Sequence, residues 1–98
     1  MNQDLIIINE YCSRSSVEPD FIIQLENEGL IEIYVDNGER YIHQSQLRRL
    51  EQYVRWYYDL SINIEGIDVI QNLLDRMDEM KNEISRLREV VRLVDKEL

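Results

Sequence analysis

The sequence predicts a mainly α-helical fold in which a small head with a short β-hairpin leads into a C-terminal coiled-coil helix. In two short segments and one long segment, apolar residues recur at three- and four-residue spacing, which is typical of helices with one buried face. Alternating apolar and polar residues flank Asp36-Asn37-Gly38, which indicates a tight hairpin. The 98 residues allow one small head and a helical extension. We expect the head over residues 1–62 and the extension over residues 63–98, in one continuous unit.

Two short helices joined by a turn are predicted before the hairpin. Asn9 is expected to cap the first helix, which ends in the polar run of residues 14–16. The second helix starts at Glu18-Pro19, because proline lacks the N–H that is unpaired at the first helical position. Gly29 can close this helix in the left-handed conformation. The buried face of the second helix is expected to consist of Phe21, Ile22 and Leu25.

Residues 31–43 predict a two-stranded hairpin that forms a wing beside these helices. Asn37-Gly38 would form its loop, since a type I′ turn needs two positive φ angles. The expected cross-strand pairs are Tyr34 with Tyr41, Ile33 with Ile42, and Glu32 with His43. His43 is therefore interpreted as a wing residue paired with a carboxylate, not as a ligand or a general base.

The segment after the hairpin predicts a third helix, which Ser45 caps and residues 59–63 interrupt. Two aromatic residues of this helix, Trp56 and Tyr58, could either pack in the core or reach a partner. The buried side of the helix is expected to hold Leu47, Leu50, Val54 and Tyr57.

From Ile70 to the end of the chain, the apolar positions form a heptad seam that one helix cannot bury alone. A helix folded back on its own head would leave much of the seam uncovered, because the stripe is about 40 Å long. We therefore expect a homodimer; its orientation stays open, since a parallel pair brings Glu83 to Arg88 but Arg76 to Lys81. The seam residues are Ile70, Met77, Ile84, Val91 and Leu98 at position a, and Leu73, Met80, Leu87 and Val94 at position d.

The net charge of −9 is concentrated in the first half of the chain. Residues 1–47 hold nine acids and two arginines, a net −7, whereas residues 48–98 hold eleven acids and nine bases, a net −2. Between Val17 and Gly29, the second predicted helix carries acids but no Lys or Arg. Nucleic-acid binding depends on cations that face the phosphates, so this helix should repel DNA and favour a basic protein.

Arg48, Arg49 and Arg55 form the one compact basic group. They could contact phosphate, but pairing with Glu51 and Asp59 on a solvated helix face explains them more simply. Three cations cannot easily offset the acidic half of the chain, so nucleic acid is not the expected partner.

Other functional classes lack a sequence signal. The chain has no phosphate-binding glycine loop, no nucleophile motif and no metal-ligand spacing around its one histidine, so we expect neither an enzyme nor a cofactor. The longest aliphatic run, Leu5–Ile8, is far shorter than the roughly 20 residues of a membrane span. With no signal-peptide pattern, a cytoplasmic location is expected. Cys12 is the only cysteine and is expected to be buried.

The order helix, turn, helix, wing, two further helices and coiled coil resembles the MerR-type winged-helix regulators over essentially the whole chain. Ser16-Val17-Glu18-Pro19 through Glu28-Gly29-Leu30-Ile31 is similar to the second helix of that family and its exit into the wing. Residues 60–70, after Arg55, are similar to a segment shared by CbpM-type chaperone modulators and HspR-like heat-shock repressors.

The resemblance implies two branches with different partners. In DNA-binding MerR-type regulators, the positions of Asp20, Ile23 and Gln24 usually carry Arg, Arg and Tyr, none of which this chain keeps. That departure favours the CbpM-type branch, whose members bind the J-domain of a CbpA-type or DnaJ-like co-chaperone and block its encounter with Hsp70. The alternative is an HspR-like transcriptional regulator of stress genes that binds DNA through the same head.

Ile23 is the strongest candidate for partner contact, because its side chain should point away from the buried side of the helix and lie among acidic residues. The plainer interpretation is that single exposed apolar residues are common on protein surfaces. The predicted partner-binding residues are Glu18, Asp20, Ile23, Glu26, Asn27, Trp56 and Tyr58.

Overall fold

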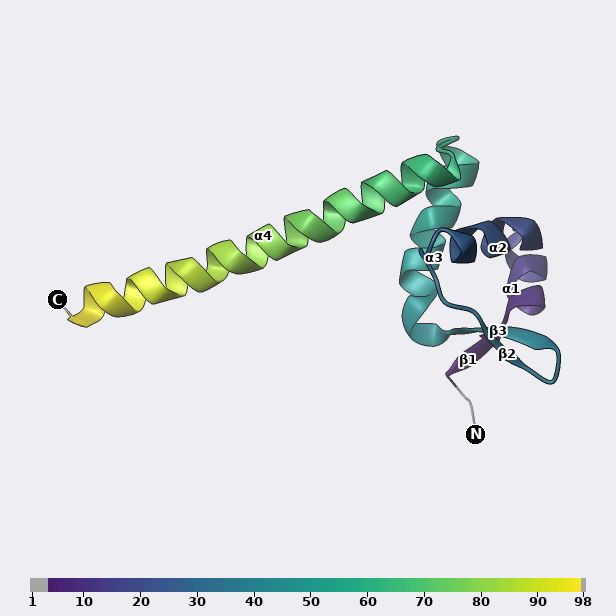
Figure 1. Cartoon of the computed structure of the whole chain (residues 1–98), viewed down its shortest axis with the longest axis horizontal. Helices are drawn as coiled ribbons and strands as arrows, with labels where there is room; N and C mark the ends of the chain where they lie inside the picture. The colour runs from purple at the N-terminus through teal and green to yellow at the C-terminus, as the bar shows by residue number, and fades with distance from the viewer. Residues whose placement is uncertain (1–3, 98) are drawn as a thin grey trace. The chain divides into compact units, whose positions relative to one another are not determined.

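The computed structural model describes residues 4–97 and forms a winged helix-turn-helix head followed by a long helix (Figure 1), which confirms the predicted fold class. The head begins with a short strand, two helices and a hairpin, and a third helix follows through a 3₁₀ turn and ends in a π-helical turn. In chain order the elements are β1 (Leu5–Ile7), α1 (Ile8–Ser15), α2 (Pro19–Asn27), β2 (Tyr34–Asp36), β3 (Glu39–His43), η1 (Gln44–Gln46), α3 (Leu47–Val54), η2 (Arg55–Asp59) and α4 (Ile64–Glu97).

The chain separates into two compact units, Met1–Asp68 and Val69–Leu98. The first turn of α4 belongs to the head, because Ile64 and Ile67 are buried in its core. Asn63 caps this turn: its Oδ1 accepts the Gly66 N–H at 2.8 Å. The helix break expected at residues 59–63 is present at residues 60–63, since the π-helical turn still includes Asp59 and α4 begins at Ile64.

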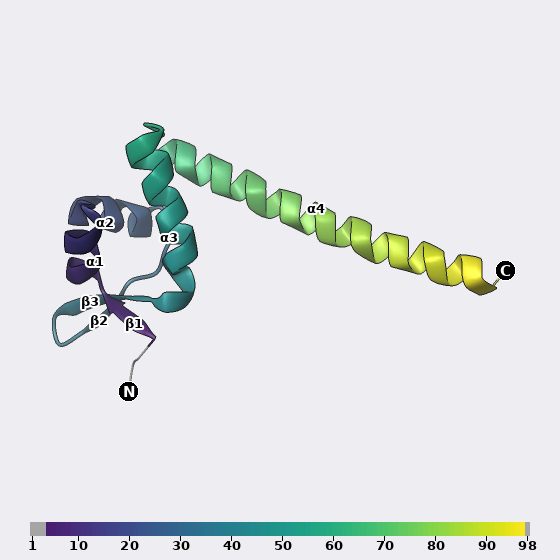
Figure 2. The ribbon, with the colours of Figure 1, turned by 180° about the vertical axis from the view of Figure 1, so that it is seen from behind.

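The wing contains a strand that the hairpin pattern did not reveal. β1 pairs with β3, so the sheet is three-stranded with the order β1-β3-β2. Ile6 of β1 faces Ile42 of β3. The sequence did not reveal β1, because an aliphatic run as short as Leu5–Ile8 has no clear helix or strand period. The sheet lies along one side of the head, with α1, α2 and α3 to the same side of it in both views (Figures 1 and 2).

The predicted cross-strand register is partly correct. Tyr34 faces Tyr41, and Asn37 and Gly38 have φ angles of 52° and 79°, as a type I′ turn requires. The predicted pairs of Ile33 with Ile42 and Glu32 with His43 are wrong, because β2 begins only at Tyr34. Ile42 and His43 pair instead with Ile6 and Leu5 of β1, on the other edge of β3. The backbone N–H of Glu32 donates instead to Gln46 Oε1 at 2.7 Å, which holds this segment against η1.

Two predicted helix caps are also wrong. Asn9 lies inside α1, which begins at Ile8 directly after β1 and has no side-chain cap. Ser45 lies inside the 3₁₀ turn η1, and His43 caps that turn: its Nδ1 accepts the Ser45 N–H at 3.0 Å. Because α1 follows β1 directly, its N-cap position is taken by Ile7, whose side chain has no oxygen to accept the first free N–H groups. His43 is therefore a structural residue, although its partner is Ser45 and not Glu32.

Helix α2 has the boundaries that the sequence predicted. Pro19 occupies its first turn, and Gly29 follows it with a φ of 75°. The Leu30 N–H donates to the Leu25 carbonyl at 2.9 Å, and the Gly29 N–H donates to the Glu26 carbonyl at 2.9 Å. These two bonds form a Schellman motif, which closes a helix in the left-handed conformation. The start and the end of α2 are thus set by its own residues.

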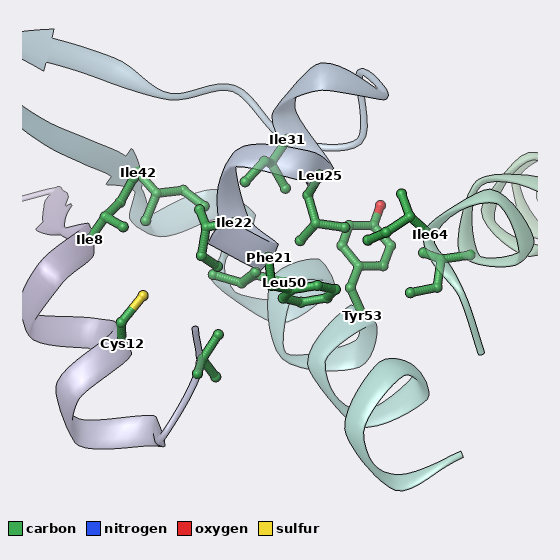
Figure 3. Packing of buried hydrophobic residues seen from close by; sticks show 12 residues of the cluster. Ile8, Cys12, Phe21, Ile22, Leu25, Ile31, Ile42, Leu50, Tyr53 and Ile64 are labelled. Atoms are coloured by element: carbon green, nitrogen blue, oxygen red, sulfur yellow. The ribbon is translucent and has the colours of Figure 1, made fainter. Parts of the chain in front are cut away.

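The core of the head lies between α1, α2, α3 and the inner side of the sheet (Figure 3). Phe21, Ile22 and Leu25 are buried in it as predicted, and so is Cys12. Tyr53 is also fully buried, and its hydroxyl lies 3.4 Å from the Leu30 carbonyl, which accepts its hydrogen bond. The side chains of this buried cluster are Ile8, Cys12, Val17, Phe21, Ile22, Leu25, Ile31, Ile42, Leu50, Tyr53, Ile64 and Ile67.

Candidate functional site

The outward face of α2 is acidic. Because one side of the helix is buried in the core, the residues between the buried positions point away from it. The carboxylates on and beside the helix are all exposed, and no Lys or Arg occurs between residues 17 and 29. The exposed acids are Glu18, Asp20, Glu26 and Glu28. The acidic surface predicted from the sequence is therefore present on the folded head.

Ile23 lies within this acidic face. Its side chain is half-buried, and it is neither in the buried cluster of the head nor among the apolar side chains packed against that cluster. Asp20 is three residues before it, while Glu26 and Asn27 are three and four residues after it, so all three neighbour it on the helix surface. Asp20, Glu26 and Asn27 are exposed. The result is one apolar side chain with acids on both sides along the helix.

Little inside the head neutralises these acids. Asp20 accepts a hydrogen bond from Gln24 Nε2 at 2.8 Å, a neutral donor on the same helix. Within residues 4–97, Glu18, Asp20, Glu26 and Glu28 form no salt bridge. The ion pairs of Glu83 with Arg86 and of Glu89 with Arg92 lie far along the chain on α4. The negative charge of the α2 face is thus available to an external cation.

Tyr58 connects the π-helical turn η2 to the start of α2. Its hydroxyl accepts the backbone N–H of Glu18 at 2.9 Å, and its ring packs edge-on against Phe21 with centroids 5.6 Å apart. At 40% exposure, Tyr58 is accessible beside the acidic face. Tyr58 therefore meets the predicted partner-binding residues of α2 at Glu18.

Trp56 lies differently from Tyr58. Its side chain is half-buried and packs against the buried cluster, with its ring centroid 6.0 Å from that of Tyr53. Tyr57, expected in the buried side of the third helix, is partly buried and packs on Phe21 with centroids 4.4 Å apart. Tyr57 lies inside the five-residue π-helical turn, whose wider winding rotates its side chain relative to the position it would have in a regular α-helix. Three- and four-residue spacing could not have identified that rotation.

The seam of α4 is an exposed apolar stripe in the single chain. Its side chains from residue 73 to residue 94 are each between 48% and 58% exposed. Ile70 is half-buried, and Leu98 lies outside the described residues. A shallow apolar hollow on the same stripe is lined by Ile84, Leu87 and Val91 together with Arg88. The predicted dimerisation residues within 73–94 thus share one uncovered helix surface.

The comparison with protein families identifies the chain. The model of the MerR HTH family of regulatory proteins matches residues 6–89, which include the described head from Ile6 in β1 onward and most of α4. The chain belongs to the MerR HTH family. No curated protein and no solved structure matches it in the corresponding comparisons.

In this MerR-family chain, the basic group on the third helix sits next to acids. Arg48, Arg49 and Arg55 are all exposed. Arg55 lines a hollow between α1 and α3 together with Glu51 and Asp59. The compact basic group therefore does not form a surface free of negative charge.

The described part of this MerR-family chain contains neither a membrane-spanning helix nor a group of side chains placed to bind a metal ion. Among the described helices, none combines the length and the apolar character needed to cross a bilayer. Within residues 4–97, no three side chains among His, Cys, Asp and Glu come together in a metal-binding arrangement.

Proposed function

We propose that this MerR-family chain is a CbpM-type chaperone modulator that uses the outward face of α2 to bind the J-domain of a CbpA-type or DnaJ-like co-chaperone and inhibits its action with Hsp70. One observation carries the proposal. The helix that would face DNA in a winged helix-turn-helix regulator presents four exposed carboxylates and no cation. A polyanion is repelled by such a face, whereas a basic protein helix is attracted to it.

The arrangement assigns different roles to the charged and the apolar side chains. Exposed ion pairs contribute roughly 0–1 kcal/mol each, so the carboxylates would mainly steer and orient a basic partner. Ile23, half-buried between Asp20 and Glu26, would supply the apolar contact that the partner covers. Tyr58 would add a second contact and also hold the start of α2 through Glu18. Neither a cofactor nor catalysis is required.

The rival function is that of an HspR-like regulator that binds operator DNA. The observations in its favour are the exposed Arg48, Arg49 and Arg55 and the regulatory character of the family. Two measurements on the full chain separate the functions: capture of a purified J-domain, and a gel shift on the DNA upstream of its own gene at increasing salt. J-domain capture without a shift supports the modulator. A tight, salt-sensitive shift without capture supports the regulator.

A substitution at Ile23 tests the binding face itself. Ile23→Arg places a cation among the acids and removes the apolar contact, so J-domain affinity should fall by at least about tenfold, or roughly 1.4 kcal/mol. Val35→Arg makes the same change on the wing, where Val35 is 66% exposed, and should leave the affinity unchanged. Isothermal titration of both variants measures the difference. Equal affinities for wild type and Ile23→Arg would place the interface elsewhere.

We further infer that the protein is a homodimer joined through the seam of α4, because an uncovered stripe of this length requires a second helix. The charges beside the seam favour an antiparallel pair. When Met77 meets the partner's Met80, Arg76 faces the partner's Glu83, and Val69 faces the partner's Val90, each twice by symmetry. A parallel pair would bring Arg76 against the partner's Lys81 twice. The exposed bond of Glu83 to Arg86 is weak enough to exchange.

A further inference from the structure

The outer face of the wing sheet carries an apolar row that crosses all three strands. Ile7 of β1 faces Tyr41 of β3, and Tyr41 faces Tyr34 of β2. Directly opposed residues in a sheet project to the same side, and the side alternates at each residue. The row Ile7-Tyr41-Tyr34 therefore lies opposite to Ile42, which is buried in the core.

This row is not covered by the rest of the head. Tyr34 is 44% exposed, and Ile7 and Tyr41 are half-buried. Among the described residues, none of the three belongs to the buried cluster or to the apolar side chains packed against it, whereas Ile6, on the inner face, does. In Figure 2 the helices of the head lie together on one side of the strands. The outer face is thus an unpartnered apolar and aromatic surface.

The charges next to the row are negative. Asp36 faces Glu39 across the hairpin end, on the same face as Tyr34 and Tyr41. Two like charges directly opposite each other in a sheet destabilise it, and a cation placed between them would remove that cost. Arg40, the nearest cation along the strand, faces Val35 and so projects to the other side. His43 is also on this face, and its Nδ1 lies at hydrogen-bond distance, 2.8 Å, from Ser45 Oγ.

We propose that the outer face of the sheet, Ile7-Tyr41-Tyr34 with Asp36 and Glu39, is a second docking surface that binds a cationic amphipathic helix of a partner protein. The outer strands are about 10 Å apart, because neighbouring strands lie about 4.8 Å from each other, and an α-helix with its side chains is about 10 Å wide. Aliphatic residues of the helix would cover the row. A Lys or Arg would reach Asp36 and Glu39. This proposal does not depend on the J-domain as partner of α2.

The acidic pair excludes two other kinds of ligand. Nucleic acid and membranes that contain anionic lipids both attract basic surfaces, and Asp36 and Glu39 would repel them. A basic protein helix satisfies both features of the face, since it offers an apolar side and positive charge together. The like-charged pair then acts as a specificity element that is relieved on binding.

The test uses the full chain and a synthetic helical peptide of leucine and lysine as the probe, with the same peptide carrying glutamate for lysine as the control. Tyr34→Ser should weaken binding of the lysine peptide by about tenfold. Glu39→Gln should weaken it by about threefold and raise the melting temperature by about 2 °C, because it removes the repulsion with Asp36. Val35→Ser, on the opposite face of the same strand as Tyr34, should change peptide affinity less than twofold.

Glu39→Gln should lower peptide affinity and raise the melting temperature, and this combination separates a docking role from a purely structural one. A residue that only supports the hairpin would change stability without this loss of binding, and that result would overturn the proposal. Unchanged peptide affinity in a folded Tyr34→Ser variant would overturn it as well. Loss of binding in Ile23→Arg alone would assign the cationic helix to α2 instead. Dissociation of a dimer by Tyr34→Ser, measured by sedimentation, would make the face a contact between copies.

Discussion

Replacement of Ile84 by Asp gives the sharpest measure of the dimer that we propose. Ile84 is 49% exposed in the single chain and lies in the middle of the exposed seam. Full burial of an isoleucine side chain contributes about 1.5–3 kcal/mol, so covering the exposed half contributes about 1 kcal/mol. A carboxylate without a partner at the same place adds a cost of about 2 kcal/mol or more. Each chain therefore loses about 3 kcal/mol.

Symmetry doubles this loss, because the dimer contains the substitution twice. The resulting cost of about 6 kcal/mol corresponds to a dissociation constant about ten-thousandfold larger. Sedimentation velocity at low micromolar concentration should show a dimer for the wild type and a monomer for Ile84→Asp. The matched control is Ser85→Asp, which adds the same charge one residue away, outside the seam. Ser85→Asp should remain dimeric.

Two results would refute the assignment of the seam. If Ile84→Asp stays a dimer at the same concentration, the helices associate through another surface. If Ser85→Asp dissociates as well, the effect comes from the added charge and not from its place in the heptad. Circular dichroism at matched concentration separates a loss of association from a loss of the helix itself.

Three further predictions concern the dimer and the head. In the antiparallel dimer, the double variant Leu73→Cys, Ile84→Cys should form disulfides between chains, whereas Ile84→Cys alone should not. A disulfide formed by Ile84→Cys alone would indicate parallel helices. Gly29→Ala should lower the free energy of unfolding by about 1 kcal/mol, because an added Cβ meets no atom within 4 Å and only backbone strain remains. Gly29→Asn should lower it less in urea titrations, and equal losses would argue against a left-handed requirement at this position. Burial raises the pKa of the Cys12 thiol and of the Tyr11 hydroxyl, so the unfolded chain loses these protons at a lower pH than the folded protein. The free energy of unfolding should therefore fall as pH rises above about 8.5, and a urea midpoint that has not fallen by about pH 10.5 would contradict this.

Local chemistry made some elements predictable from the sequence. Pro19 and Gly29 define the start and the end of α2 because each has a backbone preference that acts within one turn. Asn37-Gly38 defines the hairpin for the same reason, since both residues adopt positive φ at little cost. The acidic face of α2 followed from these boundaries, because the buried side of a helix also determines its outward side.

The seam and the charge asymmetry could likewise be predicted from the sequence. Both are properties of spacing and composition: a heptad repeat needs only a continuous helix to line up its apolar residues. The family assignment agrees with this part of the prediction, since it extends over the head and most of α4. The proposed J-domain partner rests on residues of α2 and is a separate question for experiment.

Only the tertiary structure decided which distant segments meet. β1 joins the sheet through β3, and the Tyr58 hydroxyl binds the N–H of Glu18, 40 residues away. The partial exposure of Tyr57 depends on the π-helical turn that contains it, and such a turn has no period that a sequence displays. The sequence by itself thus determined the helices, the hairpin, the seam and the acid-rich second helix, because those signals act over a few residues or one repeat. The third strand, the capping His43, the junction at Glu18 and the row across the outer sheet face required the fold, because contacts between remote residues depend on packing and leave no local pattern.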